Sequence, residues 1–102
     1  MIDPVLNEIL NEIDLPSAYG RFLEPTEPPF VVYMGSGQET FEADNTIYHA
    51  QNRHRIEYYF AIKDEDAEAD IEAAILKHGR QYEKSEDVYI DSEDIFVIYY
   101  YI

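Results

Sequence analysis

The sequence of 102 residues contains no cysteine and no tryptophan. The absence of cysteine excludes disulfide bonds and thiolate metal sites, and it favours the cytosol over secretion. The N-terminal stretch is acidic and has no long apolar run, so we expect no secretory signal peptide. No stretch reaches the roughly 18 apolar residues of a membrane-spanning helix, so we expect no membrane association. One soluble domain spanning residues 1–102 is the organisation that this length predicts.

Positive charge is also scarce. The sequence contains 7 lysines and arginines and 22 aspartates and glutamates, which gives a net charge of −15. This balance argues against binding to a nucleic-acid backbone, which depends on basic side chains that displace counterions. Two interpretations of the charge remain. The acids keep the protein soluble by mutual repulsion, or they face DNA, as a mimic of it or as a repulsive wall beside it.

Catalytic and metal-binding motifs are missing. His49 and His54 lack the even spacing that places two ligands on one face of a strand, and His78 falls at a predicted helix end. The acidic run 64–70 has no central glycine, which a calcium loop requires. No serine lies in a nucleophile elbow, and Gly35–Gly37 is too short for a phosphate loop. We therefore expect neither an enzyme nor a metal or cofactor site.

Two helices are predicted, over about residues 3–14 and 64–78. Asp3 can cap the first helix, and apolar residues recur along it at helical spacing. Asp64 can cap the second, and Gly79 suits a left-handed stop after it. The acids of the second helix are expected to form its first turns and a face in contact with water: Asp64, Glu65, Asp66, Glu68 and Asp70.

The residue pattern between these helices predicts strands. A proline-rich connector over residues 15–29 leads to a strand that starts near Phe30 and ends at Gly35–Gly37. A polar loop or weak hairpin follows, with a tight turn at Asp44–Asn45.

Residues 46–62 have the next strand pattern. They fit two strands, over 46–50 and 53–62 with a turn at Gln51–Asn52, or one long bent strand. Alternation in the second half predicts one face with His54, Ile56, Tyr58, Phe60 and Ile62, and another with Arg55, Glu57, Tyr59 and Ala61.

A closing hairpin around Asp91–Glu93 completes the chain. The order of elements predicts an α+β fold, with a mainly antiparallel sheet of four to five strands and two helices packed on one face.

The last strand is apolar on both faces. Ile95, Val97, Tyr99 and Tyr101 alternate with Phe96, Ile98, Tyr100 and Ile102. Two helices can hardly cover both faces of the sheet, so a neighbouring subunit is the economical cover for the second face, although ten tyrosines could also fill a small core. The candidate interface residues are Tyr58, Tyr59, Phe60, Phe96, Ile98, Tyr99, Tyr100, Tyr101 and Ile102.

The ordered set of motifs resembles the small tail-terminator, or head-to-tail joining, proteins of siphophages and prophages of Gram-positive bacteria. The resemblance begins with Leu15-Pro16 and with Pro28-Pro29-Phe30 before a strand. Further matches cover nearly the whole chain: Ala43-Asp44-Asn45, the strand from His54 to Asp64, His78-Gly79, Tyr82 with Lys84 and Glu86, and Ile90 with Ser92 and Glu93. The Tyr59–Ile62 segment and the triple tyrosine at the C-terminal end depart from the pattern.

The resemblance implies a structural protein that forms a ring, commonly a hexamer, on the finished tail tube. Its partners would be further copies of itself, the tail-tube protein and the head connector. DNA would pass through the lumen without sequence-specific binding. The location would be the virion, and the host cytoplasm during assembly. The segment that would line the lumen or reach a partner contains Ser36, Gln38, Glu39, Glu42 and Asp44.

Two other functions stay open at this point. An acidic inhibitor that mimics DNA would bind a nucleic-acid-binding host protein through carboxylates spaced about 7 Å apart along one surface, as phosphates are. A small enzyme or toxin–antitoxin component is compatible with the size alone, and it would need a polar pocket with converging carboxylates.

Overall fold

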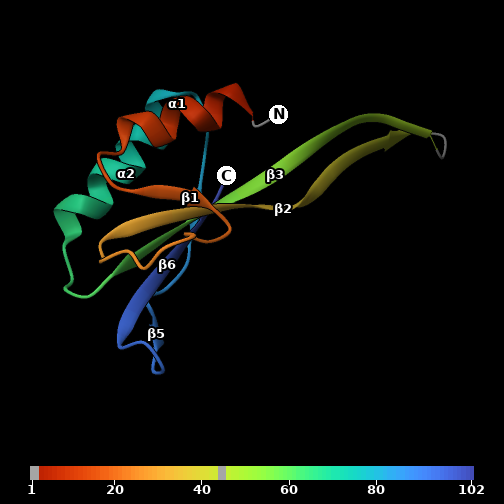
Figure 1. The fold of residues 1–102 in the computed structure, drawn as a ribbon. Coiled ribbons are helices and arrows are strands. Elements are labelled where there is room, and N and C mark those ends of the chain that lie inside the picture. Colours follow the sequence, from red (N-terminus) through yellow and green to blue (C-terminus); the bar gives the residue numbers. More distant parts are fainter. Residues whose placement is uncertain (1–2, 44–45) are drawn as a thin grey trace.

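The computed structural model describes residues 3–43 and 46–102, with side chains described for residues 3–40 and 52–102. Two helices and six strands follow one another along the chain (Figure 1). They are α1 (Pro4–Glu12), β1 (Ser17–Tyr19), β2 (Phe30–Ala43), β3 (Thr46–Phe60), α2 (Glu65–Lys77), β4 (Glu83–Lys84), β5 (Val88–Ile90) and β6 (Ile95–Tyr101).

The strands form one sheet in the order β1-β2-β3-β6-β4, and β5 also pairs with β6. β1 is parallel to β2, and the other pairs are antiparallel. The predicted α+β class with a mainly antiparallel sheet is confirmed. The sheet has six strands, more than the four to five expected, because β1 in the connector and the short pieces β4 and β5 each contribute a few residues.

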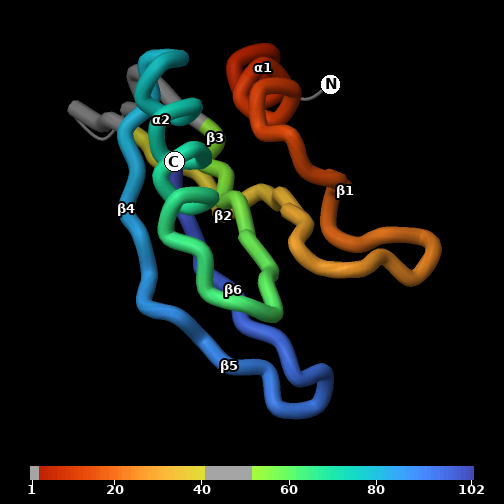
Figure 2. Tube along the Cα trace, turned by 90° about the vertical axis from the view of Figure 1, so that its left-hand side faces the viewer, coloured from red at the N-terminus to blue at the C-terminus, as the bar shows by residue number. Residues whose placement is uncertain are grey.

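Both helices lie on one face of the sheet, side by side (Figures 1 and 2). α1 begins as predicted, because the Asp3 carboxylate accepts a hydrogen bond from the Val5 amide at 2.9 Å and Pro4 is the first helical residue. The apolar stripes of the helices and the facing strand residues form one core: Leu6, Ile9, Leu10, Ile13, Ile71, Ala74 and Ile75 with Val31, Ile56, Tyr58, Phe60, Ile98, Tyr100 and Ile102.

α2 has the predicted caps. The Asp64 carboxylate accepts from two amides of the first turn, and Gly79, with φ of +79°, ends the helix in the left-handed conformation. The prediction of a fully solvated acidic face is wrong for Glu68, which is only 2% exposed. Its carboxylate turns toward the ammonium groups of Lys63 and Lys84, which compensate its burial.

The predicted strand end at Gly35–Gly37 is also wrong. β2 continues to Ala43 through a bulge, because Gly35 pairs with His54 and the next pair is Gln38 with Asn52. One extra residue is therefore accommodated in β2, and Gly37 takes a φ of +99° that glycine adopts without steric cost.

No turn occurs at Gln51–Asn52, so the two-strand alternative is wrong and the single long strand is confirmed. Gln51 and Asn52 pair in the ladder with Glu39 and Gln38, and the ladder keeps both residues extended. The polar segment after the bulge is accordingly a strand rather than a loop. The turn predicted at Asp44–Asn45 lies outside the described residues.

The distal halves of β2 and β3 form an arm, which we define as residues 36–43 and 46–53. Figure 1 shows this arm projecting away from the helices and the other strands. β1 pairs with β2 only at Val31–Tyr33, and the β6 ladder covers β3 only from Arg55 to Phe60. Within the described part of the chain, the arm is therefore a two-stranded ribbon.

β6 lies between β3 on one side and the short strands β4 and β5 on the other. β6 therefore lies inside the sheet, with a strand on each side. Its register with β3 sets Ile98 beside Tyr58 on the helix-covered face, and it sets Tyr99 beside Glu57 on the opposite face. No helix of the described residues is long and apolar enough to cross a membrane.

Candidate functional site

The predicted interface residues are divided between the two faces of the sheet. Six of them lie on the face that the helices cover: Tyr58, Phe60, Phe96, Ile98, Tyr100 and Ile102. All except the partly buried Phe96 are at most 4% exposed, because they contact the chain's own core. These side chains therefore offer little or no surface to another molecule while the helices stay in place.

Tyr59, Tyr99 and Tyr101 lie on the opposite face, which we call the open face because neither helix covers it (Figure 1). Phe30, which was not among the predicted interface residues, stacks on Tyr59 with ring centroids 5.1 Å apart. Tyr99 and Tyr101 stack at 6.3 Å, and Tyr101 is 40% exposed. The open face therefore carries a row of aromatic rings that the chain only partly shields from water.

A charged pair lies among these rings. Glu57 is 5% exposed, and its carboxylate accepts from the Arg55 guanidinium at 2.6 Å and from the Tyr59 hydroxyl at 2.6 Å. Burial, together with the hydrogen bond to Glu57, raises the pKa of Tyr59, so its hydroxyl remains a donor. The Arg55 guanidinium also lies 5.9 Å from the centroid of the Tyr99 ring.

This charged pair was not among the predicted site residues. The available signal was the alternation of Arg55, Glu57 and Tyr59, which places the three side chains on one face of the strand. Alternation fixes the face but not its surroundings, and only the register with Tyr99 shows that the pair is enclosed by aromatic rings. The open face is thus apolar with one internally satisfied ion pair.

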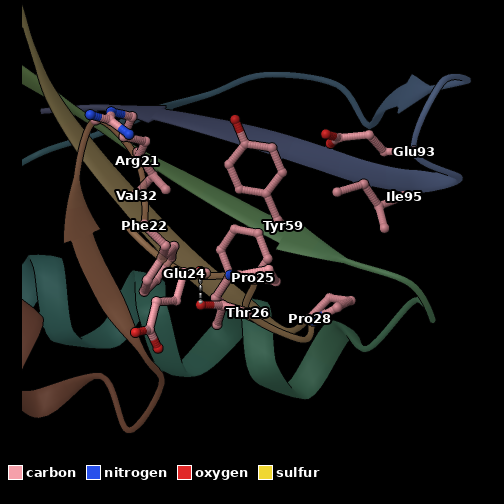
Figure 3. A pocket seen from close by; sticks show the side chains of 12 residues that line it. Arg21, Phe22, Glu24, Pro25, Thr26, Pro28, Val32, Tyr59, Glu93 and Ile95 are labelled. Atoms are coloured by element: carbon pink, nitrogen blue, oxygen red, sulfur yellow. Dashed lines mark hydrogen bonds between the residues drawn. The ribbon is translucent and has the colours of Figure 1, made fainter.

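The connector covers one end of the open face and leaves a pocket of about 440 Å³. Phe22 packs edge-to-face on Phe30 with ring centroids 5.1 Å apart. Figure 3 shows Arg21 and Glu93 on opposite sides of the Tyr59 ring, at the rim of this pocket. The pocket is therefore a largely apolar recess whose charged lining residues are Arg21, Glu24 and Glu93, and it is continuous with the open face through Tyr59.

Four of the residues predicted to line a lumen or reach a partner belong to the arm: Ser36, Gln38, Glu39 and Glu42. Gln38 donates to the Asn52 side-chain oxygen at 3.1 Å, and Glu39 accepts from Arg53 at 3.0 Å. Ser36 is in the bulge. The backbone of Glu42 pairs with Ile47, but its side chain and the whole of Asp44 lie outside the described residues.

A second charged cluster lies at the other edge of the sheet. Lys84 of β4 bridges Glu68 and Glu72 of α2 at 2.9 and 2.8 Å, and the hydroxyl of Tyr100 donates to Glu72 at 2.8 Å. Burial raises the pKa of Tyr100, and its hydrogen bond to Glu72 adds to the shift. The cluster joins β4 to α2, and each of its charged groups has a partner. Its role is therefore to stabilise the fold.

The described residues include no group of three or more histidine, aspartate or glutamate side chains arranged to hold a metal ion. No known family model matches the sequence. No curated protein matches it significantly. The open face and the arm are therefore the features on which a function can be argued.

Proposed function

We propose that this protein is a structural subunit that assembles with copies of itself into a ring, which terminates a phage tail tube and joins the tail to the head. The single observation that carries the proposal is the open face, with its half-buried aromatic side chains and no helix over it. The resemblance of the motif order to tail-terminator proteins is the reason for proposing a ring on a tail tube in particular.

The chemistry of the open face supports assembly. Tyrosine and arginine are enriched at protein interfaces, where an apolar body is buried and a polar tip keeps a hydrogen bond. Tyr59 and Arg55 both meet this description, since each is bonded to Glu57 within the same subunit. A neighbour could therefore cover the rings without leaving the Glu57 charge unpaired.

A ring requires two different surfaces on each subunit, because head-to-tail contacts join unlike patches. Exposed apolar side chains outside the open face could form the second surface. Leu23 is 87% exposed and Ile62 is 83% exposed. Leu23 belongs to the connector, and Ile62 precedes α2. These positions are candidates for the contact with the next subunit.

Charge and shape suit a channel for DNA. The net charge of −15 would repel the phosphate backbone, so that DNA could pass without being held. The arm projects from the body and carries Glu39, so an arm directed inward would add negative charge to the lumen. The subunit would be located in the virion, and in the host cytoplasm before assembly. Its partners would be the tail-tube protein and the head connector.

Electron microscopy of phage particles produced without this protein tests the proposal. We expect separate heads and tails, with tails of uncontrolled length, and joined virions when the wild-type protein is supplied from a plasmid. A matched plasmid carrying Tyr99→Ser and Tyr101→Ser should fail to restore joining. Normal joined virions in the absence of the protein would refute the proposed function.

A further inference from the structure

Within the described residues, no strand pairs with either edge of the arm. Pairing of β2 with β1 ends at Tyr33, and backbone bonding of β3 to the β6 end of the chain ends at His54. An isolated two-stranded ribbon is only marginally stable in water, and free edges are templates for pairing with another strand. The arm is therefore the part of the described chain that an added strand would stabilise most.

The direction of the free groups on β3 follows from the last backbone contacts with β6. His54 and Ile102 exchange hydrogen bonds, with the Ile102 amide 2.9 Å from the His54 oxygen and the His54 amide 3.4 Å from the Ile102 oxygen. The amide and carbonyl of His54 thus face away from β2. Because direction alternates along a strand, those of Asn52 face the same way, and no described strand lies beside them.

The two edges carry opposite charge. Residues 46–53, the β3 side of the arm, contain no acid and contain Arg53, which bonds Glu39 of the same arm. Residues 35–43, which include the β2 side, contain Glu39 and Glu42 and no base. Opposite charges on adjacent strands favour pairing and like charges oppose it. By charge, the β3 edge of one copy is therefore expected to pair with the β2 edge of a second copy rather than with another β3 edge.

We propose that the β3 edge of each arm pairs antiparallel with the β2 edge of the arm of the next copy, so that the arms of a ring close into a shared barrel. The inference rests on the proposed ring and names the contact that closes it. β2 and β3 are already antiparallel, so repeated head-to-tail pairing continues the same alternation around the ring. A closed barrel leaves no free edge.

Asn52 offers a matched pair of variants. Asn52→Pro removes the outward amide, whereas Asn52→Ala removes only the side chain that bonds Gln38. We expect Asn52→Pro to weaken self-association at least about tenfold in sedimentation velocity, with Asn52→Ala close to wild type. Equal association of the two variants would refute the arm contact.

Cysteine crosslinking tests the contact without relying on a folded proline variant. The chain has no cysteine, so a Gln38→Cys copy mixed with an Asn52→Cys copy reports only the contact between two arms. We expect the mixed disulfide to form at least about tenfold faster than in a control mixture with Glu65→Cys, which is exposed on α2.

Each alternative result has a defined meaning. Equal rates for the arm pair and the control would overturn the inference, as would a faster disulfide between two Asn52→Cys copies, which would indicate like edges in contact. If joined virions require the protein but arm crosslinks do not form, the ring function stands and the arm contact is wrong. If virions form without the protein, the proposed function fails whatever the arms do.

Discussion

The Lys84 ammonium nitrogen lies 2.9 Å from a carboxylate oxygen of Glu68, a residue of α2 whose side chain is only 3% exposed. This contact joins the short strand β4 to the helix layer. β4 has only two residues in its ladder with β6, and the ion pair adds a side-chain contact between this short strand and α2.

Replacing Lys84 with methionine should lower the free energy of unfolding by about 2 kcal/mol, because Glu68 and Glu72 lose a cation they share. The value is below that of a fully buried pair, since Lys84 is 34% exposed and Lys63 still contacts Glu68. Urea unfolding measures the change. Lys77→Met is the control, because its pair with Glu12 is exposed and should contribute little to stability.

Stability should depend on the ionisation of Glu72. Burial of this carboxylate opposes its charge, but hydrogen bonds from Lys84 and Tyr100 outweigh the burial and lower its pKa below the ordinary value of 4.5. A lowered pKa in the folded state stabilises the protein above the unfolded value, and this stabilisation is lost as the pH falls through the folded value.

The stability difference between wild type and Glu72→Gln should therefore be constant near neutral pH and shrink as the pH drops below about 4.5. Thermal unfolding at a series of pH values gives the difference. Comparison with this variant removes the general effect of protonating the other acids. A difference that stays constant down to pH 3 would show that Glu72 is not held in its charged form.

The bulge in β2 should depend on Gly37. Alanine there meets no atom within 4 Å, but a φ of +99° is strained for any residue with a β-carbon, at a cost of about 1–2 kcal/mol. Amide hydrogen exchange should show faster exchange in the arm and unchanged exchange in the core. Gly35→Ala is the control, because its added carbon makes only an ordinary contact, 3.9 Å from the Tyr19 hydroxyl.

Tyr101→Ser should weaken self-association roughly tenfold or more while changing the free energy of unfolding by less than about 1 kcal/mol. The reason is that Tyr101, at 40%, is the most exposed of the three open-face tyrosines and lies outside the buried core of the subunit. Sedimentation velocity over a concentration series measures association. Leu76→Ser, at a position 56% exposed on α2, should leave association unchanged, and equal weakening by both variants would argue against the open face as an interface.

The sequence predicted the helices well because their signals are local. Asp3 and Asp64 are caps that act within one turn, and Gly79 ends α2 by its own backbone freedom. The arm was predicted only in part. A Gly-Ser-Gly segment is the usual sign of a strand end, but here the long ladder with β3 continues past it and turns the extra residue into a bulge.

The interface prediction shows a similar limit. Alternation separates Tyr58 from Tyr59 correctly, but both sets are equally aromatic, so composition alone cannot tell which set the helices cover. Burial of Glu68 could not be foreseen either, because its partners Lys63 and Lys84 come from outside the helix.

Sequence by itself determined the α+β class, the limits of both helices within a few residues, and the two apolar sides of the last strand, since each depends on caps or periodicity between near neighbours. Tertiary structure decided which side of that strand stays open, how far β2 and β3 extend into the arm, and which acids are buried. These outcomes depend on register and on helix placement, which bring residues far apart in the chain into contact and which no local pattern encodes.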